Sequence, residues 1–447
     1  MTGHYKAYPE YKNSGHKWLG DIPSQWNIWR AKRIFSSVRV AAKDTDEQLA
    51  ASQKYGVVPQ SLMMKLNSAK VMLALKGTDS FRHVEKDNFV ISLRSFEGGI
   101  EHSAYEGCVS PAYTVLEASL HMHSAFYKYL LKCEPFIAAL QSSTDSLRDG
   151  KSISYEQFGA IHLPYCSYEE QQKIASFLDH ETAKIDTLIT KQEKLIELLK
   201  EKRQAVISHA VTKGLNPNTP MKNSGVEWLG EVPEHWGTSR LKFVTSIFGR
   251  IGFRGYTTDD IVDEGEGALV LSPSNVLNGK LDLNSKAYLS WDKYYESPEI
   301  IVEPNDILLV KTGSTYGKSA IVESNSEPMT INPQMALLKK SKISAKYLAY
   351  VMSSDLIKAI IKVSNTGSGM PTMTQENINS FPIPTPSDSE AKNIVNFLDQ
   401  RTTNIDNLIK LAGKAIEIIN KRKAALISAA VTGKIDVRNW QPQGDQK

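Results

Sequence analysis

Residues 312–319, TGSTYGKS, combine glycine, lysine and hydroxyl side chains in the way that phosphate-binding loops do. A P-loop has four residues between its two glycines, whereas only three separate Gly313 from Gly317. The residues that follow, 319–322, are typical of a strand, and a P-loop leads into a helix. We therefore predict a β-hairpin loop here and no nucleotide site.

Other residues that could hold a catalytic metal lack the companions that such a site needs. A nuclease of the Asp…Glu-x-Lys type is not expected, because residues 10–12 have no Asp upstream and residues 390–392 lie at an expected helix start. His121 and His123 precede an expected helix with no third ligand in evidence, so surface histidines are favoured over a metal site. The Asn/Asp-Pro-Pro-aromatic run of a DNA amino-methyltransferase does not occur. The sequence predicts no catalytic residue and no metal ligand.

Length and composition set broad limits on the fold and the partners. The chain has 447 residues, 41% of them hydrophobic and 23% charged, as expected for a soluble protein of two or three domains. It has no apolar run near the roughly 18 residues of a membrane span and no apolar signal stretch, so we expect a cytoplasmic protein. Three scattered cysteines, Cys108, Cys133 and Cys166, favour neither disulfides nor a metal site. A net charge of +4 permits a nucleic-acid partner.

The elements that would position a site occur twice in the chain. Residues 13–26, NSGHKWLGDIPSQW, recur as residues 223–236, NSGVEWLGEVPEHW, at an offset of 210. Two Trp residues at matched positions are hard to obtain by chance. We call this segment the opening motif, and each half of the chain begins with one copy.

A second pair of matching segments closes each half. Residues 174–189 recur as residues 394–409 at an offset of 220, and residues 202–212 recur as residues 421–432 at an offset of 219. Between the opening motif and these segments only a general pattern survives. The flanks were thus kept alike while the middles diverged, which is expected of a protein whose two middles recognise different things.

The closing segments are predicted to be long helices. Apolar residues over 168–212 recur at alternating spacings of three and four, an a/d heptad register, and the second copy repeats it. Gly214 and Gly433 follow the helices as expected of helix ends. The two helices would pair as an antiparallel coiled coil; the alternative is that each packs on its own globular domain. The predicted coiled-coil spacer positions are Leu178, Ile185, Leu188, Leu195, Leu199 and Val206 in the first copy, and Leu398, Ile405, Leu408 and Ile419 in the second.

The two middles are predicted to be α+β. Apolar, β-rich runs bounded by turn residues occur at 71–75, 89–93, 268–271 and 307–310. Short helices are expected at 124–131 and 344–352. The fold class is therefore α+β, with two globular domains separated by two long helices and a pseudo-two-fold internal repeat.

At this point the sequence resembles the specificity subunit of type I restriction–modification systems. The resemblance is carried by Trp-Leu-Gly-x-Ile/Val-Pro-x-x-Trp at both starts, by both Ile-x-x-Phe-Leu-Asp…Thr-x-x-Ile-Asp-x-Leu-Ile helices, and by the Leu/Ile-Pro before each helix. It covers essentially the whole chain. It implies target-recognition domains at 1–165 and 216–385, conserved spacer helices at 166–215 and 386–435, and a C-terminal tail at 436–447.

The resemblance also implies a division of labour. Each domain would recognise one half of a bipartite site in double-stranded DNA, while the helices fix the gap and dock methyltransferase subunits, two of them in our interpretation. Restriction–translocase subunits would then join. S-adenosylmethionine, ATP and Mg²⁺ would belong to those partners, with no cofactor on this chain and no membrane partner.

Lys and Arg are expected to contact phosphates, and side chains at base edges to give specificity. From residue type and position in loops we favour Arg94, Ser95, Arg148 and Lys151 in the first domain, and Asn275, Lys311, Thr312, Ser314, Tyr316 and Lys318 in the second. The alternative for each is a solvated surface residue. The resemblance cannot select among them, because base-contacting positions in the family vary with the target sequence.

Two other functions stay open at this stage. One is a structural coiled-coil adaptor without a DNA role, against which the two divergent middles argue. The other is a recognition protein fused to a cryptic nuclease or methyltransferase activity.

Overall fold

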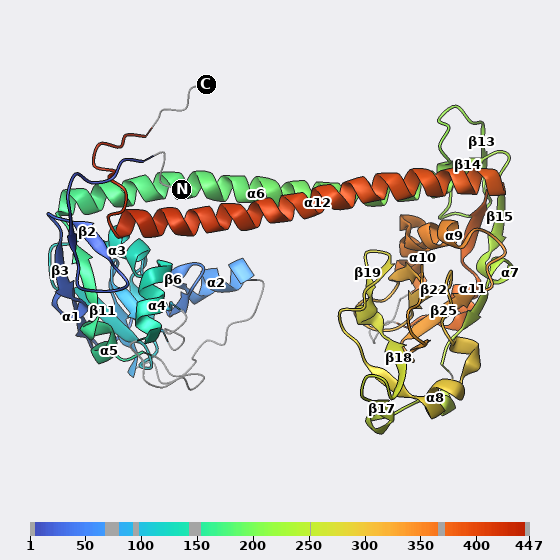
Figure 1. Cartoon of the computed structure of the whole chain (residues 1–447), viewed down its shortest axis with the longest axis horizontal. Helices are drawn as coiled ribbons and strands as arrows, with labels where there is room; N and C mark the ends of the chain where they lie inside the picture. Colours follow the sequence, from blue (N-terminus) through green and yellow to red (C-terminus); the bar gives the residue numbers. More distant parts are fainter. Residues whose placement is uncertain are drawn as a thin grey trace. The chain divides into compact units, whose positions relative to one another are not determined.

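The computed structural model describes residues 5–67, 80–92, 98–142, 153–250, 252–364 and 372–442. The chain forms two compact units: unit 1 comprises residues 1–192 and 414–447, and unit 2 comprises residues 193–413. Two long helices, α6 (Tyr168–Lys213) and α12 (Asp388–Val431), each contribute to both units (Figure 1). We call the rest of each unit its globular part. The division into domains and spacers drawn from the sequence stays a prediction.

The globular part of unit 1 is built on a four-stranded antiparallel sheet. Its order is β4 (Phe35–Val38), β11 (Thr114–Ala118), β8 (Phe89–Ile91), β9 (Ile100–His102). Two small antiparallel pairs join β5 (Leu49–Ser52) to β6 (Gly56–Pro59) and β7 (Arg82–Val84) to β10 (Gly107–Val109). The helices are α2 (Gln60–Asn67), α3 (Ser124–Leu130), α4 (Glu134–Ser142) and α5 (Tyr155–Ala160).

The flanks of unit 1 form short antiparallel pairs. The opening motif contributes β1 (Tyr11–Asn13) and β2 (Asp21–Pro23), which pair with each other. Next come β3 (Asn27–Arg30) and α1 (Ala31–Ile34), and β3 pairs with β12 (His162–Tyr165), which leads directly into α6. The chain thus enters and leaves the globular part side by side.

Unit 2 repeats these flanks around different sheets. Its flanking elements are β13 (Met221–Asn223), β14 (Glu231–Pro233), β15 (Gly237–Arg240), α7 (Leu241–Val244) and β26 (Pro382–Thr385). The strands pair as in unit 1, β13 with β14 and β15 with β26. The repeat in the sequence is therefore a repeat of structure.

Between these flanks unit 2 carries two sheets. The six-stranded one has the order β16 (Ser246–Phe248), β25 (Met335–Lys339), β22 (Ile307–Val310), β23 (Ser319–Ile321), β20 (Lys280–Leu281), β19 (Val276–Leu277). The four-stranded one has the order β17 (Ile261–Val262), β21 (Tyr288–Ser290), β18 (Gly267–Leu271), β24 (Met329–Ile331). The helices are α8 (Trp291–Tyr295), α9 (Ala345–Ser353), α10 (Asp355–Ser364) and α11 (Gln375–Asn379).

Several predicted elements are confirmed within a few residues. The runs at 268–271 and 307–310 are β18 and β22, whose residues are all buried, as expected for central strands without polar alternation. The run at 89–93 contains β8, and the two short helices are α3 and α9. The run at 71–75 lies outside the described residues. No helix in the described ranges has the length and hydropathy needed to cross a membrane.

In each unit the two helix segments run antiparallel. In unit 1 Phe177 near the start of α6 and Val431 at the end of α12 belong to one buried core. Further along α6, Asp186 forms an ion pair of 2.6 Å with Lys423, which precedes Val431 on α12. Moving forward on one helix therefore means moving backward on the other. This observation supports the coiled-coil interpretation of the heptads.

The buried face of the paired helices differs from the predicted heptad register at one of its two positions. Leu178, Ile185, Leu398 and Ile405 are buried as predicted, and Leu199, Val206 and Ile419 are partly buried. However, Leu188 and Leu408 are 50% exposed and Leu195 is 44% exposed. In each case the next residue along is the less exposed one: Ile189, Ile409 and Ile196. The repeat alternates four and three from the first leucine, instead of three and four, because adjacent apolar residues left either choice open.

Candidate nucleic-acid interface

The opening motif attaches each globular part to the start of a long helix. The indole Nε1 of Trp26 donates a hydrogen bond of 2.9 Å to Glu170, and that of Trp236 donates one of 2.9 Å to Glu390. Both glutamates lie in the first turn of their helix, where a carboxylate also interacts favourably with the helix dipole. The repeated tryptophans thus hold each globular part on its long helix. We call the long helices, the opening motifs and the contacts between them the scaffold.

The same motif also contacts the end of the other long helix. Gly433, with a φ of 72°, follows α12, and a Cβ there would lie 2.3 Å from Cδ of Pro23 and 3.2 Å from the ring of Trp26. Gly214, with a φ of 75°, follows α6, and its Cβ would lie 3.4 Å from the ring of Trp236. Glycine at both helix ends therefore permits the left-handed turn, and at Gly433 also the close approach of the motif.

A second pair of contacts joins a short helix of each globular part, α3 or α9, to a long helix. The hydroxyl of Tyr129 on α3 donates to Asp179 of α6 at 2.7 Å, and that of Tyr350 on α9 donates to Asp399 of α12 at 2.6 Å. Burial comes first, and the carboxylate second, in raising the pKa of Tyr350 above its ordinary value, so this phenol stays a donor. The scaffold is the same in both units, whereas the sheets beyond it differ in strand number and order.

The predicted loop of the second domain connects β22 to β23. Its backbone is closed by hydrogen bonds from Val310 to Lys318 (2.8 Å) and from Gly317 to Val310 (2.9 Å), with positive φ at Gly313 and Gly317. The loop is thus a β-hairpin connection, as the sequence predicts. Ser314 and Lys318 are exposed on it, and Thr312 and Tyr316 are partly buried. Five of the predicted residues therefore lie together.

Lys311 at the base of this loop is the residue best suited to meet an anion. Its backbone is held by Gln334 and Met373 at 2.9 and 2.8 Å. Burial alone lowers the pKa of its ammonium group, with no carboxylate contributing in the opposite direction. A partly desolvated cation of this kind is stabilised when a phosphate or a guanine edge approaches, because the new hydrogen bonds replace the lost hydration.

Asn275 does not join this group. It ends the short 3-10 helix Pro273–Asn275 beside β19, at the far edge of the six-stranded sheet, and its side chain is buried. Its amide nitrogen donates to the carbonyls of Asp282 and Ser285 at 2.9 and 2.8 Å. Both amide hydrogens are used within the fold, so the side chain stabilises a turn here and has no donor left for an adenine.

In the first domain the predicted residues Arg94, Ser95, Arg148 and Lys151 lie outside the described residues. The structure does bring together two cations that the sequence analysis missed. Arg39 follows β4 and Arg82 lies on β7; burial first, and the charge of Arg39 second, lower the pKa of Arg82. Two like charges held close together favour the binding of an anion between them. The pair was missed from the sequence because no sequence signal links residues 43 positions apart.

The comparisons with known proteins agree with this architecture. Residues 253–418 match the family model described as the type I restriction modification DNA specificity domain. The type I restriction enzyme MjaVIII specificity subunit of Methanocaldococcus jannaschii is 28% identical over 319 residues, which are 70% of this chain and 70% of that protein.

Two solved structures share the fold. A chain of a type I R-M system, solved to explain complex assembly and conformational transition, has a TM-score of 0.65 at 15% identity, over 93% of this chain and 99% of that one. The HsdS subunit from Thermoanaerobacter tengcongensis has a TM-score of 0.52 at 14% identity, over 95% of this chain and 100% of that one.

The two units share their flanking strands and their contacts with the long helices, and the two solved structures match the chain across both units. In sequence and in fold the chain is similar to the specificity subunits of type I restriction enzymes.

Proposed function

We propose that the globular part of each unit recognises one half of a bipartite, gapped DNA site. The observation that carries this proposal is the pair of matched attachments, Trp26 with Glu170 and Trp236 with Glu390, holding two different sheets. A chain with one task would have no need of two unlike surfaces on one scaffold. In the second unit the recognition surface includes the β22–β23 loop, with Lys311 and Lys318 on phosphate or guanine.

We also propose that α6 and α12 fix the gap and dock two methyltransferase subunits, one on each unit. In unit 1 Leu188 and Ile418 are 50% and 65% exposed, and in unit 2 Leu408 and Leu198, at an offset of 220 from them, are 50% and 49% exposed. An apolar pair at equivalent positions suits a partner that binds twice in the same way. Restriction subunits would join this assembly, and its place would be the cytoplasm, where the DNA is.

Mapping of methylated adenines tests the model in which each globular part recognises one half-site. A chain that lacks residues 240–380, reconstituted with the methyltransferase partner, should lose recognition of one half-site and keep partner binding largely intact. If the deleted chain still directs methylation only to the full bipartite site, the model is wrong. A matched pair of insertions, one helical turn in each of α6 and α12, should change the gap and leave both half-sites as they were.

A further inference from the structure

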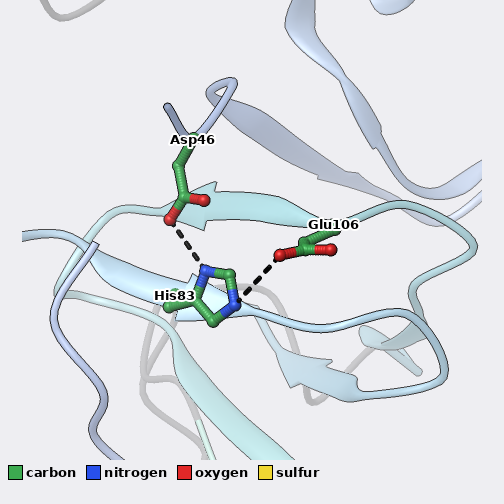
Figure 2. A group of neighbouring side chains, drawn as sticks. All are labelled: Asp46, His83 and Glu106. Carbon is green, nitrogen blue, oxygen red and sulfur yellow. Dashed lines mark hydrogen bonds and ion pairs between the residues drawn. The ribbon is translucent and has the colours of Figure 1, made fainter. Parts of the chain in front are cut away.

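Three side chains in the globular part of unit 1 meet at β7, where His83 is the next residue after Arg82. Asp46 lies in the segment between β4 and β5, His83 on β7, and Glu106 just before β10 (Figure 2). Their ligating atoms all lie within 4.8 Å of one another, and within the described ranges they form the one cluster of this kind. The function proposed above makes no use of them.

The hydrogen bond of His83 determines which tautomer a neutral ring adopts. Its ring is buried, with a side chain 4% exposed, and its Nδ1 lies 2.8 Å from Oδ2 of the equally buried Asp46. A carboxylate beside Nδ1 fixes the proton on that nitrogen. The lone pair of a neutral ring is then on Nε2, and this buried atom has no hydrogen-bond partner.

The unpartnered nitrogen faces Glu106. Oε1 of that residue lies 3.6 Å from Nε2, which is too long for a hydrogen bond. A lone pair and a carboxylate that face each other in this way call for a cation between them. Two ligands at about 2.0–2.2 Å from a tetrahedral metal are roughly 3.3–3.6 Å apart, which matches the observed gap.

We propose that Nε2 of His83 and the carboxylate of Glu106 bind a divalent transition-metal cation such as Zn²⁺. Asp46 is the positioning residue that orients the ring, an arrangement common behind metal-binding histidines. Glu106 is 60% exposed, so water can complete the coordination sphere. An imidazole ligand favours Zn²⁺ and its neighbours in the first transition row over Mg²⁺ or Ca²⁺.

One protein cation competes for the site. The ammonium of Lys43 lies 2.9 Å from Oε1 of Glu106, in an ion pair whose two side chains are more than half exposed. Exposed pairs of this kind contribute little stability, so a metal can replace the ammonium. The other competitor is a second proton on His83 itself, and the experiment below separates it from a metal.

The cation would stabilise one edge of the first globular part. The backbone already holds the segment between β4 and β5 there: His83 donates to the carbonyl of Val40 at 2.8 Å, and Cys108 donates to that of Glu47 at 2.9 Å. A metal between His83 and Glu106 would add a link from β7 to the turn before β10. This inference does not depend on the DNA-recognition role.

Isothermal titration of the full, chelator-treated chain with Zn²⁺ tests the site. Glu106→Gln is the main variant, because an exposed side chain can be changed without disturbing the fold; it should lower the affinity at least about tenfold. His83→Gln should do the same, and Lys43→Ala should raise the affinity. His102→Gln is the matched control, since His102 pairs with Asp87 at 2.9 Å in the same unit outside the cluster, and it should leave binding unchanged.

Two results would overturn the proposal. The first is a wild-type chain that binds no Zn²⁺. The second is binding that Glu106→Gln leaves intact. Metal binding should also shift the melting temperature of the wild-type chain upward by about 3–6 °C at ten times Kd, and that of Glu106→Gln by less. A doubly protonated His83 without metal predicts no shift with Zn²⁺ in either chain.

Discussion

The two globular parts differ most where the chain could vary freely and least where it is attached to the long helices. Apart from the flanking pairs, the described residues of unit 1 form one four-stranded sheet and two small pairs, whereas those of unit 2 form a six-stranded and a four-stranded sheet. Yet Trp26 and Trp236 make the same hydrogen bond, each 2.9 Å long, to the first turn of a long helix. The attachment is therefore what two unlike domains share.

This contrast separates stability from specificity. Buried contacts with the long helices hold each globular part in place. The sheets and loops farther from these contacts differ between the two units in strand number, order and charge.

The scaffold side is broken most severely at the tryptophans. Trp236→Ala removes a fully buried ring and leaves Glu390 without its indole donor, so unit 2 should lose about 3–5 kcal/mol of stability. Trp26→Ala should cost unit 1 about the same. Urea unfolding followed by circular dichroism measures both. Trp228→Ala, at a position 48% exposed, is the control and should cost far less. Unequal losses at the two buried tryptophans would break the equivalence of the units.

The corrected register of the helices is tested by neighbouring residues of α12. Ile405, 7% exposed, should cost about 2–4 kcal/mol when changed to Ala, whereas Leu408, 50% exposed, should cost under about 1 kcal/mol. Thermal unfolding of the two variants decides between the registers. A larger loss for Leu408→Ala would restore the register predicted from the sequence.

The recognition side is tested at Lys311. Lys311→Gln removes a partly desolvated cation, and we expect the affinity for the cognate duplex to fall about fivefold to tenfold, that is by roughly 1–1.4 kcal/mol. Only recognition of one half-site should suffer. Gel-shift assays with the methyltransferase partner, on duplexes altered in either half, measure this. Lys293→Gln is the control, because that lysine pairs with Glu296 at 2.9 Å. An equal loss on both halves would contradict the assignment.

The smallest effect on stability is expected at the two equivalent ion pairs between the long helices. Arg203 in unit 2 meets Asp406 through two nitrogens at 2.8 and 3.4 Å, whereas Lys423 in unit 1 meets Asp186 as a single point charge. Asp406→Asn should therefore destabilise by about 0.5–1 kcal/mol and Asp186→Asn by less. Unfolding at low and high salt compares them, since both losses should shrink as salt is added. The opposite order would show that ion-pair geometry is not what distinguishes the units.

Much of the scaffold could be predicted because it depends on local pattern. The long helices follow from apolar spacing, and the central strands from continuous apolar runs such as that of β22. The second helical match also falls into place in the structure. Arg203 and Lys423 occupy equivalent positions in equivalent ion pairs, so the offset at that point is 220 and not the 219 read from the sequence.

What could not be predicted depends on packing and on distant partners. Leu188 and Ile189 are both apolar, and only the position of the other helix decides which of them is buried. Asn275 has a side chain suited to adenine, but its burial against Asp282 and Ser285 has no sequence signature. For the same reason, nothing in the order of residues brings Arg39 to Arg82.

The division of the long helices between the units has a consequence for synthesis. Unit 2 is one continuous segment, residues 193–413, whereas unit 1 needs residues 414–447 to complete it. The ion pair of Asp186 with Lys423 closes a separation of 237 residues. Since the chain emerges from the ribosome N-terminus first, the domain that starts first is the one that finishes last. Until then the apolar face of α6 in unit 1 has no helix to cover it, and this is when a stalled or truncated chain is most exposed to aggregation.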